Sequence, residues 1–393
     1  MEEWKECRLG EICTKITDGS HFSPQACQTG YPMFSVKDML EYGFDYSNCK
    51  HISAKDFESM KNGDCVPQKG DILVAKDGSF LKQIFECKET KEEAILSSIA
   101  MFRPNQDFIT PTFLCYLLKS PKVYNYIASN CVSGSALPRI VLKDFKKVSM
   151  QVPPLPTQQK IAAILASLDD KIELNNKINT NLEQQARALF KNWFVDFEPF
   201  SGKMPEEWKV GKLSEILRLK KNPIQPGEDT SLPYLPIDLI PIKSLSIREV
   251  RPNEEALSSL LRFEENDILI GAMRVYFHRV AIAPFDGITR TTCFVLEPFN
   301  PKYFAYAAIT CNQDLAIDYA QKTSKGSTMP YAVWEGGLGD FEIPIPDEVT
   351  AEKFNNIVEP FLEQIKKSYF ENKNLQELRE SLLPKLMNGE IEV

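Results

Sequence analysis

The chain has 393 residues, which is too long for one ordinary hydrophobic core and indicates two or more domains. It is 43% hydrophobic and 25% charged, as in folded globular proteins, and no apolar run of 18 or more residues predicts a membrane span. The net charge of −8 counts against a protein that binds nucleic acid by tracking phosphates alone.

Cysteine usage indicates a reducing compartment. The ten cysteines include no Cys-x-x-Cys pair, and the chain has only three histidines, so we expect no structural zinc site. Irregular cysteines suit the cytoplasm better than a disulfide framework. Residues 1–5 lack the basic and apolar pattern of a secretory leader. We therefore expect a cytoplasmic location.

Residues 1–156 are predicted to form a first globular domain. The apolar run at residues 71–75 predicts a buried strand between turns, and residues 113–118 predict a helix opened by Pro111. Because strands and helices alternate irregularly, the domain is predicted as α/β without a named topology.

A long helix is predicted over residues 157–197. It follows a proline-rich stop at residues 153–156, Thr157 is a good N-cap, and neither proline nor glycine recurs before Pro199. Apolar or small residues alternate at spacings of four and three, which is the heptad pattern of a helix–helix seam. The predicted seam consists of Ile161, Leu165, Leu168, Ile172, Asn175, Asn179, Leu182, Ala186, Leu189 and Trp193.

The second half follows the same plan. Residues 198–346 are predicted as a second α/β domain, with a strand at 267–270 and a helix opened by Pro301. Residues 347–393 are predicted as a second long helix with a C-terminal tail. Each helix has about 38 residues and so spans roughly 55 Å. The second seam consists of Phe361, Ile365, Ser368, Asn372, Leu375, Leu382 and Leu386.

The two halves of the chain match each other in five segments that occur in the same order. The matched ranges are 4–12 with 208–216, 70–74 with 266–270, 111–116 with 301–306, 133–138 with 325–330, and 152–156 with 343–346. Five ordered matches at a nearly constant offset indicate a duplicated unit of one domain and one helix. A helix with one apolar seam must bury it, so we expect the two helices to pack together. The alternative is that each helix packs on its own domain.

This arrangement resembles HsdS, the specificity subunit of type I restriction–modification systems, over the whole chain. The most family-like segments are residues 4–12 with 208–216, the Gly-Ser-x-x-Pro loops, the junction at 152–161 and the tail at 382–391. The second junction, residues 344–348, lacks the Gln158–Gln159 pair of the first and departs from the pattern.

The resemblance implies that each domain is a target-recognition domain that reads one half of a split, asymmetric DNA site. It implies a pseudo-two-fold repeat in which the helices pack antiparallel as a coiled-coil spacer and dock two methyltransferase subunits, with two restriction–translocase subunits as optional partners. The chain itself is then non-catalytic and binds no cofactor, while S-adenosylmethionine, ATP and Mg²⁺ belong to the partners. Half-sites one DNA turn apart lie about 35 Å apart, which helices of roughly 55 Å can span.

Direct readout of bases requires Arg, Lys, Asn, Gln or hydroxyl side chains on loops that enter a groove. Four pairs of matched loops qualify by residue type: 17–21 with 220–222, 76–79 with 274–279, 97–98 with 290–292, and 133–139 with 325–331. The candidate DNA-binding residues are Ser20, His21, Lys76, Ser79, Ser135, Arg139, Lys220, Lys221, Arg274, Tyr276, Arg279, Lys325, Ser327 and Tyr331. Arg139, Arg274 and Arg279 are the strongest candidates, and for any single residue the alternative is a solvated turn. His21, His51 and His278 are expected to be structural or exposed rather than metal ligands.

Two other functional classes are less favoured. No GxxxxGK[ST] loop is present, and Pro153-Pro154 introduces a helix rather than a methyltransferase catalytic loop. A metal-dependent nuclease would use Asp77 with residues 86–88, but the second half has no counterpart of this cluster. A coiled-coil scaffold that binds only protein is the remaining alternative.

Overall fold

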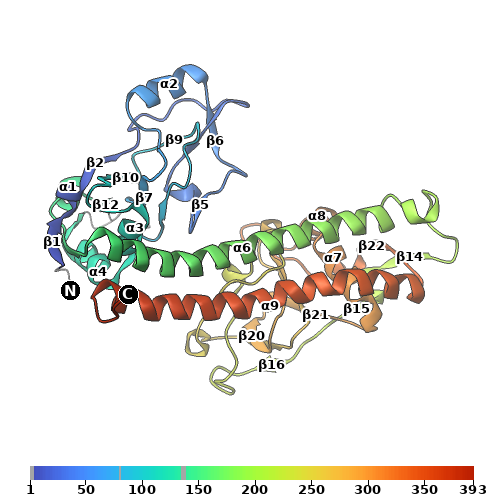
Figure 1. The fold of residues 1–393 in the computed structure, drawn as a ribbon. Helices are drawn as coiled ribbons and strands as arrows, with labels where there is room; N and C mark the ends of the chain where they lie inside the picture. The colour runs from blue at the N-terminus through green and yellow to red at the C-terminus, as the bar shows by residue number, and fades with distance from the viewer. Residues whose placement is uncertain (1–3, 79–80, 134–138) are drawn as a thin grey trace. The chain divides into compact units, whose positions relative to one another are not determined.

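The computed structural model describes residues 4–78, 81–133 and 139–393, and it divides the chain into two compact units. The first unit contains Met1–Asp170 and Gln376–Val393, and the second contains Lys171–Leu375. Each unit therefore combines one globular part with segments of both long helices, labelled α6 and α9 in Figure 1. The predicted fold class, two α/β domains with two long helices, is confirmed.

The first unit is built on a four-stranded antiparallel sheet in the order β2-β10-β7-β8. All four residues of its strand β7 are buried. Ile72 and Val74 join a core cluster with helix α3, while Leu73 and Ala75 join a second cluster around Phe34. The strand is apolar without alternation because both faces of the sheet are covered. The strands of this sheet are β2 (Cys13–Asp18), β10 (Ile99–Pro104), β7 (Ile72–Ala75) and β8 (Ile84–Glu86).

Smaller ladders and short helices complete the first unit. The ladders pair β1 with β13, β3 with both β6 and β9, β4 with β5, and β11 with β12. Helix α3 starts at Pro111, as predicted, because proline has no amide hydrogen to lose in the first turn. These elements are β1 (Lys5–Arg8), α1 (Leu9–Ile12), β3 (Tyr31–Phe34), β4 (Met39–Leu40), β5 (Gly43–Phe44), β6 (Lys50–Ile52), α2 (Ala54–Asn62), β9 (Ala94–Ile95), α3 (Pro111–Lys119), α4 (Pro121–Asn130), β11 (Val132–Ser133), β12 (Arg139–Ile140), α5 (Leu142–Phe145) and β13 (Ser149–Val152).

The second unit repeats this plan. Its main sheet is antiparallel in the order β15-β21-β18-β19, and β14 pairs with β22 as β1 pairs with β13. A further sheet has the order β16-β17-β20. The strands and helices are β14 (Lys209–Lys212), β15 (Leu217–Leu219), β16 (Pro223–Ile224), β17 (Leu260–Phe263), β18 (Ile268–Gly271), β19 (Val280–Ile282), β20 (Gly287–Arg290), β21 (Cys293–Pro298), α7 (Phe304–Cys311), α8 (Asp314–Lys322) and β22 (Glu342–Ile345).

One buried aspartate precedes the central strand in both units. The Asp71 carboxylate accepts the backbone amide of Gln68 at 2.8 Å, and the Asp267 carboxylate accepts that of Glu264 at 2.7 Å. Arg103 neutralises Asp71, whereas Lys220 neutralises Asp267. The same turn with a different cation in each unit supports a duplication followed by divergence.

The first long helix, α6 (Leu155–Phe194), begins two residues before the predicted cap at Thr157, so that prediction was wrong. Pro156 fits the first turn of a helix, where no amide donor is required. Gln158 is 1% exposed and fixes the junction with its side-chain amide. That amide accepts the backbone NH of Thr110 and donates to the carbonyls of Phe108 and Pro153, at 2.8–2.9 Å.

The two long helices contact each other within each unit. In the second unit, Asn175 donates to the side-chain oxygen of Asn372 at 2.8 Å, and the rings of Phe190 and Phe354 lie 6.3 Å apart. The residue numbers rise along α6 as they fall along α9 (Glu348–Met387), so the helices are antiparallel (Figure 1). In the first unit, Asp169 of α6 pairs with Arg379 of α9.

The buried surface of each helix is wider than the predicted seam. On α6 the seam residues that are buried are Ile161, Leu165, Ile172, Asn175, Asn179 and Ala186, and those that are half-buried are Leu168, Leu182, Leu189 and Trp193. On α9 the buried ones are Ile365, Ser368 and Leu386, and the half-buried ones are Phe361, Asn372, Leu375 and Leu382. The helices also enter the domain cores: Ile161 and Leu165 lie in that of the first unit, and Ala186 and Leu362 in that of the second. Each helix thus packs both on its partner helix and on globular parts.

Candidate nucleic-acid interface

Two of the predicted loops of the second unit meet in space. The backbone amide of Arg274 donates to the carbonyl of Pro330 at 2.8 Å, and Met273 forms an isolated β-bridge with Tyr331. Tyr331 and Lys325 exchange two backbone hydrogen bonds of 2.9 Å, which close the loop of residues 326–330, and Gly326 in this loop has a φ of +88°. We call residues 273–279 with 325–331 the second-unit loop cluster.

The second-unit loop cluster presents cationic, hydroxyl and aromatic side chains to solvent. Arg274, Lys325 and Ser327 are exposed. Tyr276 and Tyr331 are 44% and 45% exposed. Among the residues that the structure describes, neither Arg274 nor Lys325 has an ion-pair partner. These are the residue types and the exposure that contact with phosphates and base edges requires.

His278 closes the first loop of the cluster from inside the protein. Its ring is 2% exposed, with Nε2 at 2.9 Å from the side-chain oxygen of Asn312 and Nδ1 at 3.1 Å from the carboxylate of Asp314. Burial lowers the pKa of the imidazole, although the hydrogen bond to Asn312 acts in the opposite direction. These contacts hold the His278 ring inside the unit.

Two of the cations predicted to bind DNA in the second unit bond to other groups of the protein instead. The Arg279 guanidinium donates to the carbonyl of Asp238 at 2.9 Å and also to that of Ile240. The Lys220 ammonium lies 2.6 Å from Glu264 and 3.0 Å from Asp267, with its side chain 9% exposed. Base contacts by either residue would require these bonds to be exchanged. Lys221, the neighbour of Lys220, is exposed.

The described parts of the four predicted loop segments of the first unit also come together. Lys76 donates its ammonium to the carboxylate of Asp18 and its backbone amide to the carbonyl of Ser98. The backbone carbonyl of Lys76 accepts a hydrogen bond from the amide of Ile140, and the backbone carbonyl of Ser20 accepts one from the amide of Ser97. The matched loops of the sequence therefore form one surface in this unit.

The cations of that surface are paired more than those of the second unit. Lys76 is 5% exposed and paired with Asp18, and the Arg139 guanidinium lies 3.1 Å from Asp77. His21 is exposed, with Nε2 at 3.4 Å from Asp18. The half-buried Ser20 donates its hydroxyl to the carbonyl of Phe22 at 2.8 Å. Ser79 and Ser135 lie outside the described residues.

Sequence reasoning missed Phe277 and the acidic partners. Phe277 is 40% exposed and adjoins Tyr276, and its ring offers no hydrogen bond to a base edge. The exposure of the Phe277 ring marks it as a surface residue, and this exposure cannot be read from the sequence. Asp18 pairs with a lysine 58 positions away, a contact that no local pattern predicts.

The acids of the nuclease alternative are occupied. Asp77 pairs with Arg139, and Glu86 pairs with Lys88 at 3.0 Å and accepts the Thr112 hydroxyl at 2.7 Å. Over residues 4–78, 81–133 and 139–393, no group of three His, Cys, Asp or Glu side chains is arranged to hold a metal ion. In the same part of the chain, no helix has both the length and the apolar character to cross a membrane.

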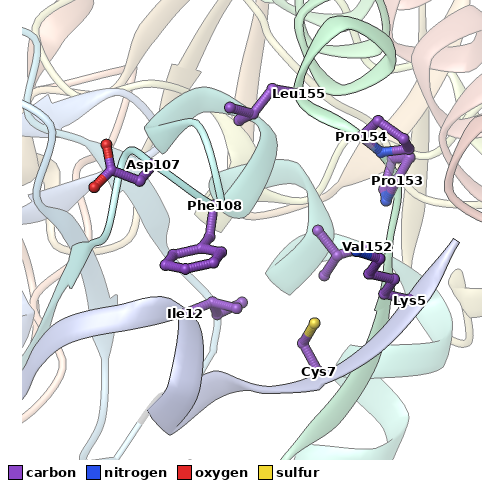
Figure 2. A pocket seen from close by; sticks show the side chains of 9 residues that line it. All are labelled: Lys5, Cys7, Ile12, Asp107, Phe108, Val152, Pro153, Pro154 and Leu155. Carbon is purple, nitrogen blue, oxygen red and sulfur yellow. The ribbon is translucent and has the colours of Figure 1, made fainter.

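A pocket of about 500 Å³ lies elsewhere in the first unit, where α6 begins. Figure 2 shows Phe108 and Ile12 on one side of it, and Val152 and Pro153 on the other. The remaining lining residues are Lys5, Cys7, Asp107, Pro154 and Leu155. None of these residues belongs to a predicted recognition loop, so the pocket is a feature of the domain–helix junction.

Comparison with known proteins assigns the same family to both halves of the chain. The model of the type I restriction modification DNA specificity domain matches residues 1–184 and again residues 205–378. The type I restriction enzyme MjaIX specificity subunit of Methanocaldococcus jannaschii is 28% identical over an alignment of 314 residues, which covers 73% of this chain and 71% of that protein. The HindI specificity subunit of Haemophilus influenzae is 24% identical over an alignment of 476 positions, gaps included, with both chains covered completely. A solved S subunit from M. genitalium shares the fold, with a TM-score of 0.57 and 16% identity over 98% of this chain and 96% of that one.

Proposed function

The chain belongs to the type I restriction–modification DNA specificity family, and from this premise we propose that each of its units reads one half of a split, asymmetric DNA target. The observation that carries the proposal is the pair of matched loop surfaces. Loops at the matching positions 76–77 with 139–140 and 273–274 with 330–331 meet in the two units, and the side chains on them differ between the units. Different side chains on equivalent loops would read different bases, so the target need not be a palindrome.

Within each half-site, the exposed polar side chains would read base edges. Arg274 is exposed and pairs with no acid among the described residues, so its guanidinium could make a bidentate contact to a guanine in the major groove. Ser327 and Lys325 lie on the adjoining loop and would contact bases or phosphates. In the first unit, His21, Ser20 and Arg139 occupy the corresponding surface, and Arg139 would exchange its ion pair with Asp77 for DNA.

The net negative charge of the chain indicates that partner subunits make most of the contacts with DNA phosphates. Residues 347–393 contain ten acidic and six basic residues, so this chain alone is poorly suited to hold DNA phosphates. We propose that two methyltransferase subunits dock on the long helices and supply those contacts, with restriction–translocase subunits as further partners. S-adenosylmethionine, ATP and Mg²⁺ would bind to these partners, and the chain itself would be non-catalytic. Such a complex would work in the cytoplasm.

Exchange of one recognition domain tests this proposal. Residues 1–150 are replaced by the equivalent domain of another family member, and the chimera is expressed with its methyltransferase subunit. We expect one half of the methylated motif to change while the other half and the gap are preserved. The reciprocal exchange of residues 205–340 is the matched control and should change the opposite half. A change of both halves in either chimera contradicts the proposal.

A further inference from the structure

We propose that Tyr276 and Phe277 form an aromatic wedge that enters a base step of the half-site read by the second unit and partly unstacks it. This inference rests on the proposed function. It adds a mode of recognition that depends on the deformability of the DNA rather than on hydrogen bonds to base edges.

The two rings form one exposed aromatic surface. Tyr276 is 44% exposed and Phe277 is 40% exposed, and their ring centroids lie 4.9 Å apart at an interplanar angle of 47°. Residues on either side are buried: Val275 and His278 are each 2% exposed. The loop therefore points its two largest apolar side chains outward while its smaller apolar residue fills the core. Apolar side chains that insert between bases, and aromatic rings that stack on them, are both used by DNA-binding proteins.

The backbone holds these rings in a strained and well-defined conformation. Arg274 and His278, which flank the short 3-10 turn Val275–Phe277, both have left-handed backbone angles, with φ of 51° and 52°. Non-glycine residues adopt this region at an energetic cost, and such strain collects at functional sites. A wedge must be rigid, because a mobile side chain would move aside instead of separating two stacked bases.

Contacts on both sides of the turn maintain that conformation. The amide of Arg274 is bonded to Pro330, and the buried ring of His278 is bonded to Asn312. The carbonyl of His278 accepts the amide of Lys243 at 2.8 Å. The Arg279 guanidinium lies 5.9 Å from the centroid of the Phe277 ring, where it supports the ring by a cation–π contact.

Charge around the rings favours DNA over a protein partner. Arg274 and Lys325 are exposed beside the wedge, and within the described part of the chain they pair with no acid. In the first unit the corresponding cations, Lys76 and Arg139, are paired. Aromatic rings beside unpaired cations fit the combination of base faces and phosphates.

The experiment uses the full chain in complex with its methyltransferase subunit and its DNA target. 2-Aminopurine is placed in turn at each position of the second half-site, because its fluorescence rises when stacking is lost. The wild-type complex should show a several-fold rise at one step, and the double variant Tyr276→Ala, Phe277→Ala should lose that rise. The variant should also bind the specific site roughly five- to a hundredfold more weakly. A second pair, Tyr276→Phe with Phe277→Trp, should restore both signals.

Phe299→Ala is the matched control, since Phe299 is 60% exposed in the same unit but lies outside the loop cluster. It should change neither fluorescence nor affinity, and the melting temperature should confirm that every variant folds. If the wild-type complex shows no sequence-specific binding at all, the proposed function fails. If specific binding is present but every fluorescence rise persists in the double variant, the unstacking belongs to the partner and the wedge is overturned.

Discussion

Asp169 and Arg379 form an ion pair inside the first unit, and they join the two long helices at positions 210 residues apart in the chain. Asp169 also accepts the hydroxyls of Tyr116 at 2.7 Å and Tyr42 at 3.0 Å. Burial alone would lower the pKa of Arg379, but the surrounding negative charge, chiefly that of Asp169, raises it above its ordinary value. The pair thus links both helices to α3 and to the turn that follows β4.

Loss of one partner of this pair should destabilise the protein strongly. Arg379→Met keeps most of the side-chain volume but leaves the Asp169 carboxylate, 8% exposed, without a cation. We expect the free energy of unfolding to fall by about 3–5 kcal/mol, measured by urea denaturation. The control is Glu173→Gln, which breaks the exposed pair with Lys177 and should cost about 0.5 kcal/mol or less. Equal losses for the two variants would show that the buried pair has no special role.

His278 should make the stability of the second unit depend on pH. Its folded pKa is lowered by burial, so below the ordinary value of 6.5 the unfolded chain takes up a proton that the native ring resists. Stability should therefore fall as the pH drops from about 6.5 towards the folded pKa, and it should be unaffected by this residue above that window. The ring faces Asp314, Arg187 and Lys243, which contribute opposing charges.

The variant His278→Asn tests this dependence, because asparagine tolerates the left-handed backbone and does not titrate. Thermal unfolding of both proteins is compared between pH 5 and pH 8. The difference in stability between wild type and variant should shrink as the solution becomes more acidic. A difference that stays constant with pH would assign the acid sensitivity to other groups.

Arg274 and Lys220 should behave differently when they are replaced by alanine. Arg274→Ala removes an exposed cation and should relax preference at one half-site by about 1–3 kcal/mol, with little change in melting temperature. Lys220→Ala leaves the buried Asp267 carboxylate unpaired and should lower stability instead. Binding to a panel of single-base variants of the target separates the two effects. An unchanged base preference in Arg274→Ala would remove this residue from the readout.

A lengthened helix pair should lengthen the gap in the target. Asn175 and Asn372 face each other across the helix pair, so a heptad inserted after Asn175 and another after Ser368 keep the seam in phase. Seven residues add about 10.5 Å, which corresponds to roughly three base pairs. The methylated motif should keep both halves and gain bases between them. Retention of the original gap would show that the helices do not set it.

The elements predicted best were those with a strong local pattern. Residues 71–75 and 267–270 were predicted as strands from their apolar runs, and the helix opened by Pro111 follows from proline chemistry. The repeat was visible because matching segments recur in order. The sheet order was out of reach, since β2 and β10 pair across more than 80 residues. The predicted start of α6 was wrong because Thr157 is a favourable cap residue, while Pro156 also fits the first turn of a helix.

The residue types of the candidate interface could be predicted from the sequence, but the ion pairs that its cations form could not. In the first unit the described parts of the four selected loops meet, and in the second unit the loops at 274–279 and 325–331 meet. Whether a cation is free depends on acids far along the chain: Asp18 for Lys76 and Asp267 for Lys220. The DNA-binding roles of the individual residues remain predictions.

Mapping of methylated bases in a genome modified by this chain and its partner tests the central claim most directly. The account predicts a motif of two short, unlike specific sequences separated by a fixed run of unspecified bases. A continuous motif, or one whose two halves are identical inverted copies, would contradict the claim that two diverged units each read their own half.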